Sequence, residues 1–200
     1  MKLLCFIGTI AAMAVLLTAA ESLADDNTIA IAQVGNGNSA ASAQNGSANV
    51  SGISQTGTAN FATIHQTGSS NKAGILQNGD SNSASITQTG SNNLAGISQL
   101  GASNYAAAIQ DGTANEILLA QNGNFDRFSS AQAGNGNIIH SSQTGNNDTD
   151  EVRQTGNNNN SADVQNGNND TINKSQVGNG FISHITQNGN NKSITISQHL

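Results

Sequence analysis

The sequence contains no proline and no tryptophan, and only 9% of its residues are charged and 3% aromatic. This composition argues against an ordinary globular core, although 200 residues are enough for one. It first suggests disorder, but disordered linkers are usually rich in proline, and charge-driven disorder needs more than a net charge of −6. Asn, Gln, Ser, Thr and Gly predominate instead, and side-chain amides can pair with one another.

The first residues differ from the rest of the chain. Lys2 precedes an apolar run over residues 3–17, and Ser22 to Ala24 supply the small residues that a signal peptidase recognises. We therefore predict a secretory signal over residues 1–24, with cleavage after Ala20 as an alternative. A retained transmembrane helix is disfavoured because the run is shorter than the ~20 residues that span a bilayer. The single cysteine, Cys5, lies inside this segment, so we expect neither disulfides nor thiol chemistry in the mature chain.

Residues 28–198 form one uninterrupted array with a period of 11 residues. Glutamine recurs sixteen times at this spacing, at Gln33, Gln44, Gln55, Gln66, Gln77, Gln88, Gln99, Gln110, Gln121, Gln132, Gln143, Gln154, Gln165, Gln176, Gln187 and Gln198. Glycine follows two residues after each of the first fifteen, beginning with Gly35, Gly46, Gly57, Gly68, Gly79 and Gly90. Five residues after glutamine stands Asn or Asp in thirteen of fifteen cases, beginning with Asn38, Asn49, Asn60, Asn71, Asn82, Asn93, Asn104 and Asn115. Such a fixed period is typical of a repeat architecture.

Each unit reads as one strand and one turn. Between the asparagine and the next glutamine, Ala or Ile alternates with polar residues, so Asn, Ala, Ile and Gln share one face of a strand of about six residues. The other face is mixed and suits solvent. Glycine takes positive φ without steric cost, so its constant position after glutamine predicts a turn.

A short strand with one apolar face needs a facing sheet. Two units would make one coil, and sixteen strands would stack into an all-β, two-sheet β-solenoid of about eight coils at the ~4.8 Å strand spacing. We expect residues 25–200 to form this single domain, with stacked Gln and Asn side chains bonded along the columns. Both terminal strands keep the repeat pattern, and no polar capping unit protects either edge of the mature chain. The expected partner of each edge is another copy, and head-to-tail addition gives a fibre.

The repeated unit resembles the curlin repeat of bacterial curli fibres. Two clear examples are QTGTANFATIHQ, at Gln55 to Gln66, and QNGDSNSASITQ, at Gln77 to Gln88. The resemblance covers essentially the whole mature chain. It implies a non-enzymatic subunit of an extracellular functional amyloid, or pilus, of a Gram-negative bacterium, acting in cell adhesion and the biofilm matrix. It also implies that the regularly spaced Gln and Asn residues direct assembly. The expected partners are further copies of the chain, a nucleator subunit and an outer-membrane secretion channel, with no nucleic acid and no membrane-embedded part.

The sequence departs from the curlin pattern in two ways. Curlin repeats are usually 22-residue units whose first half begins with Ser, whereas both halves carry Asn or Asp here. Only Asp25 to Asn27 stand where the family's major subunit has a glycine-rich export segment. The last repeat is regular, unlike the irregular basic strand that ends the family's nucleator. We therefore favour the major subunit and keep the minor, nucleating subunit as the alternative.

Three charged residues fall at inward positions of successive strands, namely Asp150, Asp163 and Lys174. Burying an unpaired charge is costly, so we expect an ion pair that brings Lys174 near both carboxylates. One hypothesis is that these residues act as gatekeepers that slow premature assembly, and the other is drift in a tolerant repeat.

Other signals point to no further site. The four histidines lack metal-ligand spacing, the Gly-Asn-Gly strings are not followed by a helix pattern, and the acidic stretch 148–151 lacks the fixed residues of a calcium loop. We expect no catalytic residue, cofactor or metal. A soluble β-solenoid that binds ice or a carbohydrate is the remaining alternative, disfavoured because the outward columns are mixed in residue type.

Overall fold

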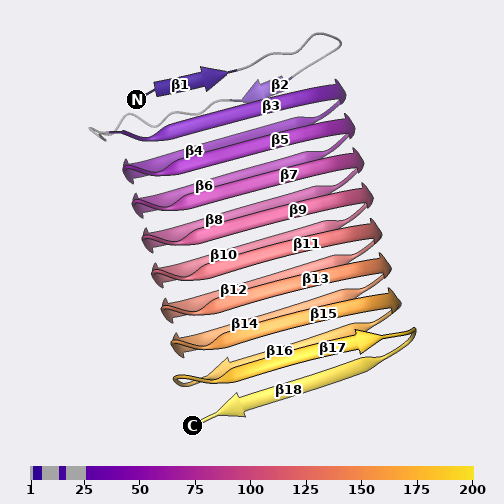
Figure 1. Cartoon of the computed structure of the whole chain (residues 1–200). Coiled ribbons are helices and arrows are strands. Elements are labelled where there is room, and N and C mark those ends of the chain that lie inside the picture. Colours follow the sequence, from indigo (N-terminus) through magenta and orange to yellow (C-terminus); the bar gives the residue numbers. More distant parts are fainter. Residues whose placement is uncertain (1, 6–13, 17–25) are drawn as a thin grey trace.

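The computed structural model describes residues 2–5, 14–16 and 26–200 and shows two stacked sheets joined by short turns (Figure 1). The first sheet contains β1 (Lys2–Cys5), β3 (Thr28–Asn36), β5 (Val50–Thr58), β7 (Lys72–Asp80), β9 (Leu94–Ala102), β11 (Glu116–Asn124), β13 (Ile138–Asn146), β15 (Asn160–Asn168) and β17 (Ile182–Asn188). The second sheet contains β2 (Ala14–Leu16), β4 (Ser39–Ser47), β6 (Phe61–Ser69), β8 (Ser83–Ser91), β10 (Tyr105–Thr113), β12 (Arg127–Asn135), β14 (Thr149–Asn157), β16 (Thr171–Val177) and β18 (Ser193–His199).

Consecutive strands from β3 to β18 alternate between the sheets, so strands two apart in sequence are neighbours in one sheet. All these pairs are parallel and in register, and each glutamine lies opposite a glutamine 22 residues away, as Gln55 does opposite Gln77. The predicted all-β, two-sheet solenoid of about eight coils is confirmed. The constant register follows from the absence of any insertion, because a slip of one residue would turn the inward set outward.

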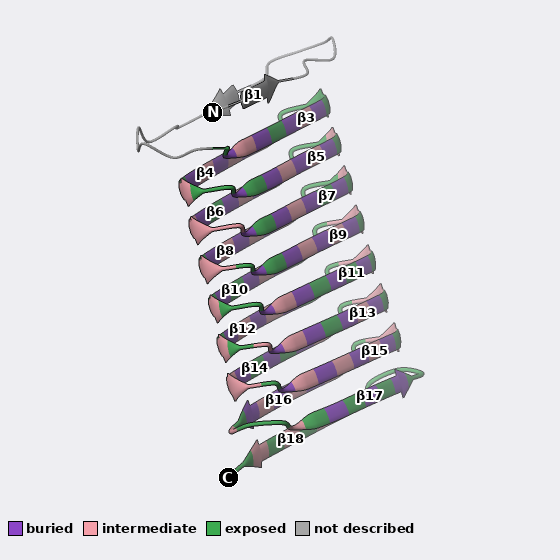
Figure 2. Cartoon of the chain, turned by 60° about the vertical axis from the view of Figure 1, so that its left-hand side comes forward, coloured by how far each residue is buried: buried purple, intermediate pink, exposed green. Residues whose placement is uncertain are grey.

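Buried residues alternate with less buried ones along the strands (Figure 2). The buried hydrophobic residues between the sheets are mainly alanine and isoleucine, and they are accompanied by many buried glutamines and asparagines. Along each nine-residue strand the second, fourth and sixth residues are inward, as in β8, where Ala84, Ile86 and Gln88 are buried. The hydrogen bonds from Ser42 to Ser51 and from Ser141 to Asp150 cross the interior, and each joins residues nine apart in sequence. One strand's fourth residue therefore faces the next strand's second residue, which sets isoleucine against alanine over several coils.

The strands are longer than the expected six residues, and the turn differs in detail from the expectation. Strand pairing continues through glutamine and glycine, and glycine has positive φ, for example +112° at Gly90. A second residue with positive φ follows two positions later, at Asn92 in this turn and at Ala48, Ser70 or Phe125 in others. The chain thus reverses over two left-handed positions, of which the sequence signalled only the glycine.

The N-terminal edge differs from the uncapped edge expected of the mature chain. In the whole chain β1 pairs with β3 over Thr28 to Ile31, and β2 pairs with β4 over Ser39 to Ala41. Both short strands belong to the predicted signal segment, most of which, including the cleavage site, lies outside the described residues. Removal of residues 1–24 would expose this edge. At the opposite end of the solenoid, β17 is the edge strand of the first sheet and β18 is the edge strand of the second sheet.

Within the described part of the chain, no helix is long and apolar enough to cross a membrane.

Candidate functional site

Two columns of glutamine run along the solenoid, one on each sheet. In the first sheet each Nε2 donates to the Oε1 of the next glutamine, from Gln33 to Gln187, at 2.6–3.0 Å. In the second sheet the same bond runs from Gln44 to Gln198 at 2.8–3.0 Å. Each column is therefore one continuous chain of amide hydrogen bonds.

The glutamines also tie the two sheets together. From Gln44 onward nearly every Nε2 donates its second hydrogen to a backbone carbonyl of the other sheet, as Gln88 does to Lys72 O at 3.0 Å. Gln66, Gln77 and Gln88 have no exposed surface. Leaving a buried amide unpaired costs about 1 to 3 kcal/mol. Replacing one of these glutamines with another residue type would therefore leave the amides of its neighbours in the column unpaired.

The asparagines form two further columns at the turns. Asn82 is typical: its Oδ1 accepts from the backbone N–H of Asn104 in the next coil at 3.0 Å, and its Nδ2 donates to Gly101 O at 2.8 Å. One side chain thus fixes both the strand start and the glycine turn of the neighbouring coil. All eight predicted asparagines, from Asn38 to Asn115, lie in these columns and are buried.

The glutamine columns end with unused acceptors. Gln33 Oε1 and Gln44 Oε1 are buried and have no hydrogen-bond partner among the described residues. The pairing with β1 and β2 stops at Ile31 and Ala41, short of both glutamines. At the opposite edge stand Gln187 and Gln198, the last members of the same two columns.

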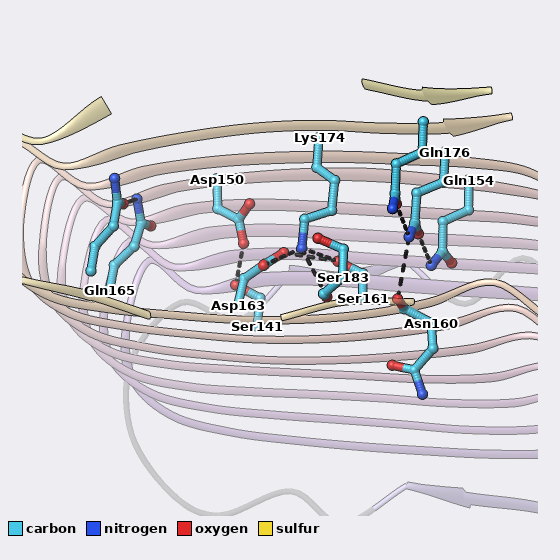
Figure 3. Close-up of polar contacts among 12 residues, drawn as sticks. Ser141, Asp150, Gln154, Asn160, Ser161, Asp163, Gln165, Lys174, Gln176 and Ser183 are labelled. Carbon is cyan, nitrogen blue, oxygen red and sulfur yellow. Dashed lines mark hydrogen bonds and ion pairs between the residues drawn. The ribbon is translucent and has the colours of Figure 1, made fainter. Parts of the chain in front are cut away.

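The predicted inward charges come together in the core (Figure 3). Lys174 Nζ forms an ion pair with Asp163 Oδ1, donates to Ser161 Oγ at 2.9 Å and donates to Ser183 O at 3.2 Å. Asp150 is held instead by the Ser141 hydroxyl, and its Oδ1 has no partner among the described residues. The structure therefore places Lys174 in contact with one of the two carboxylates.

Burial dominates the ionisation of these carboxyls. Burial raises the pKa of Asp150 to about 7, and repulsion from Asp163 adds to the rise, while the Ser141 bond and Lys174 oppose it. Burial also raises the pKa of Asp163, against the opposing bond and charge of Lys174. Both carboxyls therefore have a higher pKa in the folded chain than in the unfolded chain. The stability of the folded chain decreases as pH rises through these folded-state pKa values.

The glycine column is a steric requirement of stacking. A Cβ built on Gly90 would lie 2.0 Å from Gly112 O in the next coil. The other glycines that stand two residues after a column glutamine, from Gly35 to Gly167, meet the carbonyl oxygen of the glycine 22 residues later at 1.5–2.0 Å. Their backbones also have positive φ, a conformation that residues with a side chain rarely adopt. Gly74 differs, since a Cβ there meets nothing within 4 Å.

Sequence reasoning missed two features. Gly52, Gly74 and Gly96 lie in one outward column of the first sheet, where they form the floor of a shallow, largely apolar groove. Their strand positions carry no turn signal. The second missed feature is chemical: Asp126, Asp148 and Asp170 occupy the asparagine column, and counting Asp as equivalent to Asn hid the loss of the Nδ2 donor. The described residues contain no cluster of three or more His, Cys, Asp or Glu suited to a metal ion.

The fold and its side-chain columns define a repeat protein whose identical coils stack through backbone and amide hydrogen bonds. Three segments, residues 24–57, 57–90 and 90–123, match the family model described as the curlin associated repeat. They span half of the chain, and the chain belongs to the curlin repeat family, as the resemblance indicated. The chain has no match among curated proteins.

Proposed function

We propose that the chain is a structural subunit of an extracellular curli-type amyloid fibre that grows by head-to-tail addition of copies. The observation that carries the proposal is the pair of acceptors Gln33 Oε1 and Gln44 Oε1, which end the two glutamine columns at one edge and have no partner among the described residues. Gln187 and Gln198 at the other edge belong to the same columns, and the Gln33 and Gln44 of a following copy would continue both columns by one coil.

The family supports a wider role for this fibre. The chain would be secreted through the outer membrane of a Gram-negative cell after removal of residues 1–24, and the fibre would serve in adhesion and the biofilm matrix. The last strand keeps the repeat pattern, with Ile194, Ile196 and Gln198 at the inward positions, which makes the major subunit the first choice and the nucleating subunit the second. Prompt self-seeding would support the major subunit, whereas assembly without added seed together with strong seeding of a second curlin protein would support the nucleator.

The direct test is assembly of the chain lacking residues 1–24. We expect thioflavin fluorescence to rise after a lag, added fragments to remove the lag, and fibre diffraction to show a reflection at ~4.7–4.8 Å. A chain that stays monomeric for days without cross-β reflections would refute the fibre proposal.

The growing edge permits a sharper prediction. The N–H of Leu200 donates to Val177 O of β16, and alternate residues of a parallel strand point to the same neighbour, so the N–H of Thr195 points to the open edge of β18. Thr195→Pro removes that donor without removing a bond to β16. We expect this variant to lose fibre elongation while its circular dichroism retains the strand signal.

The matched control is Thr195→Val, which keeps the backbone N–H and should elongate like the unmodified chain. Normal elongation of the proline variant, measured with preformed seeds, would contradict growth through β18. Loss of the strand signal in the proline variant would show a folding defect, and Ser197→Pro, with the same orientation, then provides the decisive second variant.

We further propose that Asp150, Asp163 and Lys174 act as gatekeepers. All three are almost completely buried, and ordering them requires their desolvation in one arrangement. We expect D150I/D163I/K174I to shorten the polymerisation lag severalfold. The control E151I/R153I/N173I adds three isoleucines at outward positions of β14 and β16, and an equal shortening there, or an unaltered lag in the core variant, would remove the gatekeeper role.

A further inference from the structure

Three consecutive members of one asparagine column are aspartates. Asp126, Asp148 and Asp170 immediately precede β12, β14 and β16, spaced 22 residues apart, and they are 0–1% exposed. The backbone N–H of Asp148 donates to Asp126 Oδ1 and that of Asp170 to Asp148 Oδ1, both at 3.0 Å. The aspartates therefore keep the rotamer and the strand-start bond of the asparagines that they replace.

The second oxygen of each carboxyl has no such role. In the preceding member of the column, Asn104 Nδ2 donates to Gly123 O of the next coil at 2.9 Å. The corresponding atom in the three aspartates is Oδ2, which is buried and has no partner among the described residues. An ionised carboxylate would thus present an acceptor where the fold requires a donor to the glycine carbonyl.

The glycine turns that contain these aspartates are opened. Glycines three residues before a column asparagine have φ between +110° and +130°, whereas Gly123, Gly145 and Gly167, three residues before the aspartates, have +158°, +142° and +157°. Asparagine also approaches the carbonyl preceding that glycine, as Asn60 does with Thr56 O at 3.3 Å. Replacing the donor by an acceptor turns this contact into repulsion, and rotation at glycine relieves it.

We propose that Asp126 and Asp148 form a proton-binding pair within this column. Each of the two carboxyls takes up a proton on Oδ2 and donates it to the glycine carbonyl of the next coil, at Gly145 and Gly167 respectively. These two positions then match the asparagine pattern, so the coils from β12 to β16 are more stable in acid than at neutral pH. The inference concerns the folding of the chain and does not rest on fibre formation.

The electrostatics of the column agree with proton uptake. Burial raises the pKa of Asp126 from 3.8 to about 6, with repulsion from Asp148 adding to the rise and the backbone bond opposing it. Burial likewise raises the pKa of Asp148, and repulsion from Asp170 adds to it. Since the folded chain then binds more protons than the unfolded chain between pH 3.8 and about 6, stability falls as pH rises through this range.

Few other charges face the column. Lys192 occupies the next position of the column, 22 residues after Asp170. Its backbone N–H donates to Asp170 Oδ1, and its Nζ donates to Asn188 O. Arg127 follows Asp126 but lies outward, with its guanidinium 4.7 Å from the Tyr105 ring centroid. In the packed strands, His140 pairs with Glu116 on the surface, Glu151 and Arg153 are outward, and the buried charges are Asp150, Asp163 and Lys174. Burial raises the pKa of Asp150 and of Asp163 as well, so the test must separate these two carboxyls from the column.

The test compares the unmodified chain with D126N/D148N, which restores the Nδ2 donor at both positions and leaves Asp170 and the buried cluster of Asp150, Asp163 and Lys174 intact. Guanidinium unfolding of the whole chain is measured at about pH 4.5 and about pH 7.5, on either side of the raised pKa range. We expect the folding equilibrium constant of the unmodified chain to fall between these values by roughly tenfold more than that of the variant. If the chain is ordered only when assembled, the guanidinium midpoint for dissolving the fibres gives the same comparison.

The control D80N/D111N removes the same charge from two exposed aspartates and should retain the pH response. Carbon-13 NMR of aspartate-labelled chain gives an independent readout, because protonated carboxyls have distinct signals. Signals lost in D126N/D148N should be more protonated at about pH 5 than the unperturbed aspartate value predicts. Ionised signals there, or equal pH responses of the unmodified chain and D126N/D148N, would overturn the proposal.

Discussion

Replacing Gly90 with alanine should destabilise the solenoid by about 3 kcal/mol or more. The new Cβ would lie 2.0 Å from Gly112 O, a backbone atom fixed by its own coil, and alanine would have to adopt a φ of +112°. Relief requires the two coils to separate locally, which also weakens nearby bonds of the Gln88 ladder. The measurement is the guanidinium midpoint of the folded or assembled chain.

Gly74→Ala is the matched control for this prediction. It adds the same methyl group in the neighbouring strand, where a Cβ meets nothing within 4 Å and the backbone is not left-handed. Lower flexibility of the unfolded chain should make this variant neutral or more stable by about 0.4 to 1 kcal/mol. Equal midpoints for the two variants would show that the turn glycines are not needed for close stacking.

The second large effect is expected for Lys174→Met. Methionine retains the apolar stem but removes the charge from a side chain that is 3% exposed, and Asp163 is left without its ion-pair partner at 2% exposure. Breaking one side of a buried pair costs about 3 to 5 kcal/mol. Because Asp163 can then be buried only as the neutral acid, the deficit should shrink as pH falls.

Lys72→Met controls for loss of a lysine, since Lys72 is exposed on β7. Its unfolding free energy should change by less than about 1 kcal/mol at every pH. If Lys174→Met behaves like Lys72→Met, or if its deficit does not depend on pH, the ion pair contributes little to the fold.

The 11-residue spacing predicted the coil, the sheet pairing and the inward positions of Gln and Asn. In a solenoid without insertions, the repeat period alone determines which residues of neighbouring strands lie opposite one another. The turn was harder to predict. Its second left-handed position is occupied by Ala48, Ser70, Asn92 or Phe125 in different coils. Backbone bonds of the neighbouring coil impose this conformation, such as the one from Ser70 N–H to Ser47 O. Residue type at that position therefore carries little information.

The candidate site shows a similar division. The inward location of Asp150, Asp163 and Lys174 followed from counting along the repeat. Asp150 faces Ser141 across the core, whereas Lys174 and Asp163 are both the fourth residue of their strands and pair diagonally, which the repeat alone did not predict. The aspartates of the asparagine column were visible in the sequence as well. What the pattern could not supply was the glycine carbonyl opposite Oδ2, since that contact lies between coils.

The 22-residue step between hydrogen-bonded partners makes the molecule nearly one-dimensional, because each coil bonds to the coil before it and the coil after it. Removing one whole coil by deleting 22 residues would rejoin every column with unchanged chemistry and shorten the rod by one strand spacing. The length of such a chain is thus an adjustable property, and a gene can lengthen or shorten the protein by tandem duplication or loss without designing a new interface.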